Sequence, residues 1–211
     1  MCNEYEQQVA WLQYCEMMQT LEWQVPTQQS ALDLPENPSI RISDTGAAMI
    51  AEGDIVRLVP MRFSWLLPNR APMFNIRSDN PQLPKMARAL VPASAFIEYS
   101  GAKPPKSKHR VTFKAAPFMA VAAAWKPAKG NEPASFAMVT VDPGPDILPY
   151  HPRQMAVLPP SDWKRWIYDG ETMAEVLRPL PAGSLAVETI RKGSGNNTDT
   201  NVPPPAQGSL L

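Results

Sequence analysis

The chain has 211 residues, of which 44% are hydrophobic and 19% charged, the balance of an ordinary globular domain with a sizeable core. Its 20 basic and 20 acidic residues cancel, so any anion-binding site must be local rather than a property of the whole molecule. The two cysteines form no CxxC pair, which argues against a disulfide scaffold and a structural zinc site. The start of the chain is acidic rather than basic, which argues against a secretory signal, and the absence of an apolar run of ~18 residues argues against a membrane span. We expect a cytoplasmic, monomeric protein without metal or cofactor.

The chain carries 25 prolines, well above the usual ~5%, and they are scattered without a repeat. Scattered prolines are typical of short strands and irregular loops, and they leave room for few long helices. We predict an α+β fold: a single compact domain, residues 1–192, with a mixed, barrel-like β-sheet of many short strands and peripheral helices. Residues 193–211 are polar and rich in Gly and Pro, which predicts a disordered tail.

In chain order, apolar residues at helical spacing predict a helix over residues 5–23, closed by Pro26. Apolar runs bounded by turn residues then predict strands, and Ser161 is placed to cap a helix. The predicted strands are 39–43, one long or two short strands in 55–68, 73–79, strand–turn–strand in 89–100, 111–114, 118–125, 135–141, 154–160 and 185–190. The predicted loops and helices are a short helix or loop at 80–89, a basic surface loop at 101–110, a hairpin turn at 126–133, a loop at 142–153 and helices at 162–168 and 171–178.

Cys2 directly follows the initiator methionine. Removal of Met1 would leave a free α-amine beside a free thiol, with ordinary pKa values near 8 and 8.5. Such an aminothiol captures an aldehyde: the amine forms a Schiff base and the sulfur closes a five-membered thiazolidine. From position alone, the favoured interpretation is that Cys2 is merely a small residue at an exposed terminus.

Other candidate groups are few. His109, in the basic stretch KSKHR, is expected to be solvated on the surface, and His151, held between prolines, is either structural or a proton shuttle. Glu98 lies in the apolar strand SAFIEYS, so its carboxyl must be partnered or have a raised pKa that suits acid/base chemistry. Asn75 and Arg77 are one strand step apart and can face the same side of a sheet, as a polar pocket edge or as turn chemistry with a surface ion pair.

Taken in order, four segments resemble the SOS response-associated peptidase (SRAP) family, the abasic-site processing proteins, from Cys2 to about residue 170. The family begins Met-Cys and carries Asn-Ala-Arg-Ser/Ala-Glu, Leu-Ile/Val-Pro-Ala-x-Gly-Phe-Tyr-Glu-Trp and His-Asp-Arg-Met-Pro. The matching segments here are Met1-Cys2, NIRSD at 75–79, LVPASAFIEY at 90–99 and HPRQM at 151–155, followed by a strand and the helix start at 160–163.

The resemblance implies a protein that binds single-stranded DNA at an abasic site and links covalently to the ring-opened sugar aldehyde through Cys2. By position, Asn75 would orient the reacting groups, Glu98 would act as acid and base, and His151 would shuttle protons. The same residues would remove Met1, as the word peptidase implies, and a lyase activity is also implied. Arg77, with Arg88 and Arg153, would hold phosphates, and Trp65 or Phe63 would stack on a base.

The chain departs from the family pattern in three places, as a divergent, phage-related member would. Asn3 and Glu4 stand where the family has Gly-Arg, the segment from Arg62 to Pro68 is one residue longer than the family's Arg-Trp-Gly-Leu-Ile-Pro, and Gln154 is an addition. Two alternatives therefore remain: a cysteine peptidase or hydrolase that acts on other substrates, and a non-catalytic binding protein that kept the fold.

Overall fold

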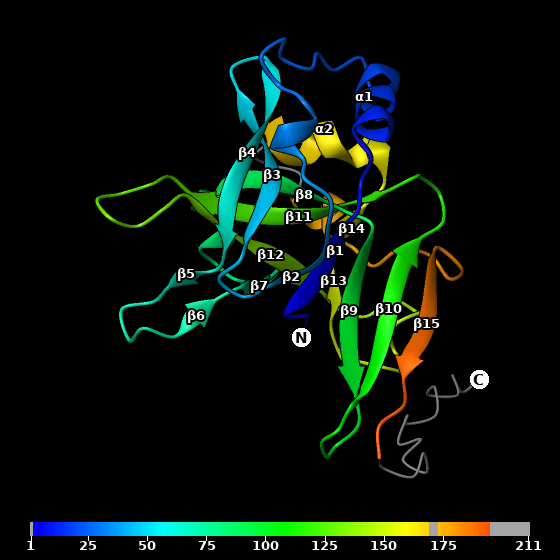
Figure 1. Ribbon diagram of the computed structural model, residues 1–211. Helices are drawn as coiled ribbons and strands as arrows, with labels where there is room; N and C mark the ends of the chain where they lie inside the picture. Colours follow the sequence, from blue (N-terminus) through cyan, green and yellow to red (C-terminus); the bar gives the residue numbers. More distant parts are fainter. Residues whose placement is uncertain (1, 169–172, 195–211) are drawn as a thin grey trace, which may run out of the picture.

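The computed structural model describes residues 2–168 and 173–194. Its larger sheet curls into a barrel in Figure 1. The barrel ring runs β12-β4-β3-β8-β11, and a further β11–β12 pairing closes it. All of its neighbouring strands are antiparallel except β4 and β12, which run parallel. The ring strands are β3 (Thr45–Glu52), β4 (Ile55–Phe63), β8 (Ala87–Ala93), β11 (Met119–Lys126) and β12 (Ser135–Val141).

Short strands extend the barrel at its rim. β7 pairs with β12 in parallel, β13 pairs with β12, and β14 pairs with β11. A separate hairpin of β5 and β6 projects from the barrel in Figure 1. These strands are β5 (Trp65–Leu66), β6 (Pro72–Met73), β7 (Asn75–Arg77), β13 (Gln154–Met155) and β14 (Val157–Leu158).

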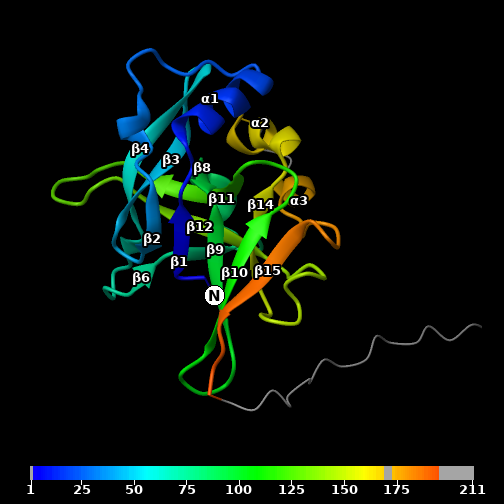
Figure 2. The same ribbon diagram turned by 45° about the vertical axis from the view of Figure 1, so that its right-hand side comes forward.

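A second sheet of five strands lies against the barrel, in the order β15-β10-β9-β1-β2. Figure 2 shows β1, β9, β10 and β15 side by side. β1 lies inside this sheet, paired with β2 on one side and β9 on the other. The strands are β1 (Glu4–Gln7), β2 (Asn37–Arg41), β9 (Ala95–Ser100), β10 (Ser107–Phe113) and β15 (Leu185–Arg191).

Two apolar cores explain why several barrel strands are apolar at nearly every position. In β11, Ala120, Ala122 and Ala124 belong to one core and Met119, Val121 and Ala123 to the other. A strand that is buried on both faces has no polar alternation. One core packs under the helices with Trp163 and Trp166, whereas the other contains Cys2.

The helices are short and peripheral, as expected. They are α1 (Trp11–Thr20), α2 (Pro160–Tyr168) and α3 (Met173–Val176), with 3-10 turns η1 (Ala31–Asp33) and η2 (Leu83–Lys85). α1 and α2 cover one end of the barrel (Figure 1). Among the described residues no helix is long and apolar enough to cross a membrane.

The structure confirms the predicted fold class and corrects several element bounds. The helix expected over 5–23 begins only at Trp11, because β1 takes Glu4–Gln7 into the second sheet. β3 was not predicted, and Ser107–Arg110 belong to β10 rather than to a loop. Residues 195–211 of the predicted tail, and the start of the predicted helix at 171–178, lie outside the described residues.

Candidate active site

Cys2 lies two residues before the start of β1 and is fully buried in the apolar core that also contains Tyr5 and Phe96. Its Sγ donates a hydrogen bond to the main-chain oxygen of Glu4 at 3.0 Å. Burial raises the pKa of the Cys2 thiol to about 12, and the nearby Glu98 carboxyl adds to this shift. The sulfur is therefore held as a thiol and needs a base before it can act as a nucleophile.

Asn75 ties this segment to the barrel. It begins β7, which pairs with β12, and its Nδ2 donates to the main-chain oxygen of Cys2 at 2.8 Å. Within the described part of the chain, its Oδ1 is buried and accepts no hydrogen bond. Asn75 therefore fixes the Cys2 main chain and keeps one acceptor for a further donor.

Glu98 lies on β9 with its side chain only 1% exposed. Burial raises the pKa of this carboxyl to about 7, although the backbone N–H groups of Tyr99 and Cys2 favour the charged form. The apolar surroundings of Glu98 on β9 thus raise its pKa, as expected from the sequence. A carboxyl with a pKa near 7 can both give and take a proton at neutral pH.

His151 comes from the loop 142–153, which we call the His151 loop. Its Nδ1 lies 4.0 Å from Oε2 of Glu98 and 2.7 Å from the main-chain oxygen of Arg153. The main-chain N–H of Arg153 also approaches this Nδ1, at 3.1 Å, so the backbone of Arg153 offers the same nitrogen both an acceptor and a donor. Burial lowers the pKa of His151, which favours the neutral ring. Four side chains from separate segments, Cys2, Asn75, Glu98 and His151, are thus brought together.

An open cleft of about 340 Å³ is lined by Asn3, Glu4, Arg41, Ile42 and Tyr99, and none of Cys2, Asn75, Glu98 and His151 lines it. Glu4 is held inside the protein: Lys108 Nζ donates to it at 2.9 Å, Tyr99 Oη at 2.8 Å and Ser39 Oγ at 3.0 Å. Burial alone would raise the pKa of Glu4, but these hydrogen bonds outweigh it and the pKa is lowered. The carboxylate is ionised, and the ammonium of Lys108 balances its charge within the sheet.

The three predicted phosphate-binding arginines have different surroundings. Arg77 forms a two-pronged ion pair with Asp79 at 2.8 and 2.6 Å on the exposed rim. Arg153 pairs with Asp142 and donates to the main-chain oxygen of Thr140 at 2.7 Å. The guanidinium of Arg88 packs on the ring of Trp166 and donates to the main-chain oxygen of that residue in α2.

Neither predicted stacking aromatic is presented on the surface. Phe63 is fully buried and stacks on Phe136 with 5.3 Å between ring centroids. Trp65 is 5% exposed, and Lys126 Nζ lies 4.5 Å from its ring centroid. In this conformation both rings support the barrel and the β5–β6 hairpin.

The expectation that His109 is solvated is wrong. His109 lies on β10 with 4% of its surface exposed, since this stretch is a strand between β9 and β15 rather than a loop. The sequence signal that was missed is the position of His109 in an alternating segment, KHRVTF, with Val111 on the same face.

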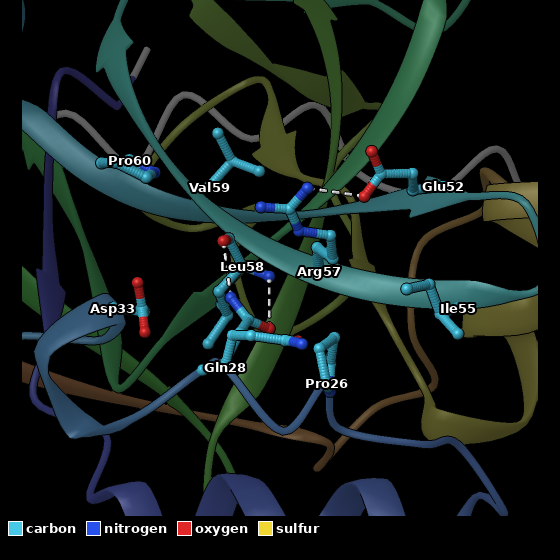
Figure 3. Close-up of a pocket in the computed structure, with 10 residues that line it drawn as sticks. Pro26, Gln28, Asp33, Glu52, Ile55, Arg57, Leu58, Val59 and Pro60 are labelled. Carbon is cyan, nitrogen blue, oxygen red and sulfur yellow. Dashed lines mark hydrogen bonds and ion pairs between the residues drawn. The ribbon is translucent and has the colours of Figure 1, made fainter.

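A second hollow, of about 380 Å³, lies between residues 26–33 and the β3–β4 hairpin (Figure 3). Gln29 crosses it and exchanges two hydrogen bonds with the main chain of Leu58, and Arg57 pairs with Glu52 at the rim. None of the predicted site residues lines it. Across residues 2–168 and 173–194, no three His, Cys, Asp or Glu side chains are grouped to hold a metal ion.

Comparisons with known proteins agree with this architecture. The chain is similar to three crystal structures: a protein from Bordetella bronchiseptica with 17% identity and a TM-score of 0.69, one from Bacteroides thetaiotaomicron with 16% and 0.65, and a phage-related protein from Bordetella bronchiseptica with 22% and 0.68. Each comparison covers 90% of this chain, and respectively 100%, 92% and 95% of the other. No curated protein matches.

At these identities the structures establish a shared fold, and a family model supplies the relationship. The model described as SOS response associated peptidase (SRAP) matches residues 1–196, nearly the whole chain. The match includes Cys2, Asn75, Glu98 and His151. The chain therefore belongs to the SOS response associated peptidase (SRAP) family.

Proposed function

We propose that this protein loses Met1 and then uses Cys2 to form a covalent thiazolidine crosslink with an abasic site in single-stranded DNA. The observation that carries the proposal is the convergence on Cys2: Asn75 binds its main chain at 2.8 Å, and the Glu98 carboxyl acts on its thiol. His151 approaches the same carboxyl at 4.0 Å. These are the partners that an aminothiol needs to capture an aldehyde.

The first stage makes a Schiff base. His151 passes the proton of the anomeric hydroxyl to the sugar ring oxygen as the bond from that oxygen to the anomeric carbon breaks, which frees the aldehyde with no net change in protons. The α-amine of Cys2 adds to the aldehyde carbon, and Glu98 in its acid form protonates the hydroxyl that leaves as water. The pKa of Glu98, about 7, leaves both protonation states populated for this exchange.

The second stage closes the ring. Glu98, now a carboxylate, takes the proton from the Cys2 thiol, whose pKa of about 12 makes it unreactive on its own. The sulfur bonds to the carbon of the protonated Schiff base, whose nitrogen keeps its hydrogen as the secondary amine of the ring, so that Glu98 ends in its acid form and one water is the only product besides the adduct. The same steps in reverse release the DNA, and water attack on the Met1–Cys2 peptide bond would use the same acid and base.

DNA would reach the site over the rim that carries Arg77 and Arg153, whose guanidinium groups suit backbone phosphates. Arg88 is the weaker candidate because its guanidinium already packs on Trp166. Stacking of a base on Trp65 would require the β5–β6 hairpin to move, because the ring is buried. Phe63 is the weaker candidate, because it ends the barrel strand β4 and its ring is fully buried against Phe136.

The test is a gel assay with a single-stranded oligonucleotide that carries one abasic site. Protein whose N-terminal Cys2 is verified by mass spectrometry should give a heat-stable shifted band, and the Cys2→Ala variant should give none. The control Cys15→Ala changes the other cysteine, which lies in α1, and should crosslink normally. Absence of a band from verified wild type would refute the proposal, and a band that persists in Cys2→Ala would indicate an ordinary lysine Schiff base.

A second function is favoured by the same buried acid–base pair: a thiol peptidase acting on other proteins. Cleavage of an unrelated protein substrate, lost in Cys2→Ala and without any DNA adduct, would support it. The described residues offer no classical Cys–His pair with an orienting third group, because His151 faces Glu98. The DNA crosslink is therefore the better supported proposal.

A further inference from the structure

A row of side chains crosses the second sheet at the position of Glu98. In the antiparallel pairing of β9 with β10, Glu98 lies directly opposite His109, and in the pairing of β10 with β15, His109 lies opposite Thr189. Residues directly opposite in neighbouring antiparallel strands point to the same face, with Cβ atoms about 5 Å apart. His109 is therefore the cross-strand neighbour of the proposed acid–base residue.

The imidazole of His109 is held at both nitrogens. Its Nε2 lies 2.7 Å from Oγ of Ser100, and its Nδ1 lies 3.0 Å from Oγ1 of Thr189. Burial lowers the pKa of His109, which favours the neutral ring. With both nitrogens engaged in the plane of the ring, its orientation is fixed and its face is left for packing.

That face contacts Tyr150, the residue directly before His151. The two ring centroids are 4.6 Å apart and the rings are tilted by 56°. The main-chain N–H groups of Tyr150 and His151 both donate to the carbonyl oxygen of Ile147, at 2.8 and 3.0 Å. One turn thus holds the main chains of both Tyr150 and His151.

Two neighbouring positions on the sheet therefore meet two consecutive positions on the loop. Glu98 faces His151, and His109 faces Tyr150. We propose that His109 is a positioning residue, which holds Tyr150 and through it sets the distance between His151 and Glu98. This inference rests on the proposed function, since it concerns the geometry of its proton transfer.

The expected consequence is a slower chemical step with unchanged DNA binding. A misplacement of about 1 Å in a reacting group can cost up to about a hundredfold in rate. His151 would remain near Glu98 without the aromatic contact, but no longer in one orientation. Binding through Arg77 and Arg153 does not depend on the row, since neither side chain is held by it.

The experiment measures single-turnover crosslinking at saturating abasic single-stranded DNA for Tyr150→Ala and Tyr150→Phe. Tyr150→Ala should crosslink at least about tenfold more slowly, whereas Tyr150→Phe, which keeps the ring, should stay within about twofold. Tyr168→Ala, at an exposed tyrosine on α2, is the matched control and should match wild type. Circular dichroism verifies folding, and equilibrium binding to undamaged single strands should be the same for all four proteins.

His109→Gln provides a second variant that retains hydrogen-bonding groups but lacks the ring. His109→Gln should slow crosslinking to the rate of Tyr150→Ala. The double variant His109→Gln/Tyr150→Ala should crosslink no more slowly than either single variant. In a His151→Ala background, Tyr150→Ala should have no further effect, which a general loss of stability would not reproduce.

The two levels of the argument fail separately. If wild type gives no adduct, the proposed function is refuted. If wild type crosslinks and Tyr150→Ala, Tyr150→Phe and His109→Gln all crosslink at the wild-type rate, the positioning role is refuted and the proposed function stands.

Discussion

At the residue scale, burial of the Glu98 carboxyl suits acid–base chemistry but lowers the stability of the folded protein when the carboxyl is charged. Its pKa is raised from the ordinary 4.5 to about 7 in the folded protein. Between these two values the unfolded chain has already released its proton, so each rise in pH favours unfolding. The contribution of Glu98 to stability is therefore greatest below pH 4.5 and lost as the pH rises through 7. The whole difference amounts to roughly 3 kcal/mol.

Glu98→Gln should separate stability from reaction. At pH 8 the variant should be about 1–3 kcal/mol more stable than wild type, because a neutral amide replaces a buried charge, and the gain should shrink toward pH 4.5. Crosslinking should fall by at least about a hundredfold, since the acid–base group is removed.

Urea unfolding at pH 5 and pH 8 measures the first effect, and the gel assay measures the second. Glu52→Gln is the control, because Glu52 pairs with Arg57 on the exposed β3–β4 hairpin and should change stability little at either pH. Equal stabilities of Glu98→Gln and wild type at pH 8 would contradict the raised pKa.

At the element scale, Glu4 joins four strands of the second sheet. It lies on β1 and is bound by Ser39 of β2, Tyr99 of β9 and Lys108 of β10. Its pKa is lowered in the folded protein, so its contribution to stability is present above about pH 4.5 and lost as the pH falls through the lowered pKa. Glu4 thus has a structural role at the edge of the cleft that it lines.

Glu4→Gln should lower the free energy of unfolding by about 1–3 kcal/mol at pH 7, because it removes a charged acceptor of three hydrogen bonds and leaves Lys108 without its counterion. The loss should shrink as the pH falls from 7 toward 3, because protonation of Glu4 through its lowered pKa removes the charge. Guanidinium titrations at the two pH values measure this difference. An equal loss at both pH values would mean that packing, rather than charge, is what Glu4 contributes.

The elements also show what sequence patterns determine. The apolar runs of β11 and β12 and the alternation in β4 were recognisable, because burial of these faces leaves a local trace. β1 was absorbed into the predicted helix, since Tyr5 and Val9 fit helical spacing and the pairing of β1 with β9 spans some ninety residues. His109 was misplaced for the same reason: its burial depends on β15, far along the chain. The grouping of Cys2, Asn75, Glu98 and His151 was predicted only through the family motifs. Tyr150 belongs to none of those motifs, so the sequence did not single it out.

At the scale of the whole molecule, charge is balanced both overall and locally. The formal net charge is zero, and the two arginines proposed for phosphate are each paired with an exposed aspartate, Arg77 with Asp79 and Arg153 with Asp142. The hydrogen bonds from Arg77 lower the pKa of Asp79 to about 2, so that pair stays ionised at neutral pH. A phosphate must displace a carboxylate to bind there.

Asp79→Asn should therefore raise the affinity for undamaged single-stranded DNA about two- to fivefold, the modest worth of an exposed ion pair. The plot of log affinity against log salt should steepen by about 0.7, because an unmasked Arg77 now neutralises a phosphate and releases counterions. Fluorescence anisotropy at several salt concentrations measures both quantities.

Two controls separate unmasking from a general change in charge. Glu52→Gln removes the same charge from a distant exposed pair and should have little effect. In an Arg77→Gln background, Asp79→Asn should give no gain. A gain that persists there would show that Asp79 acts by overall repulsion instead.

The position of β1 inside the second sheet has a mechanical consequence. A DNA strand bound at Cys2 would pull on β1, whose hydrogen bonds to β2 and β9 lie across the direction of the strand. Force along β1 would load both ladders in shear, so their bonds would have to break together rather than one at a time. A motor enzyme that moves along crosslinked DNA would therefore displace the whole domain before it could pull β1 and Cys2 out of the sheet.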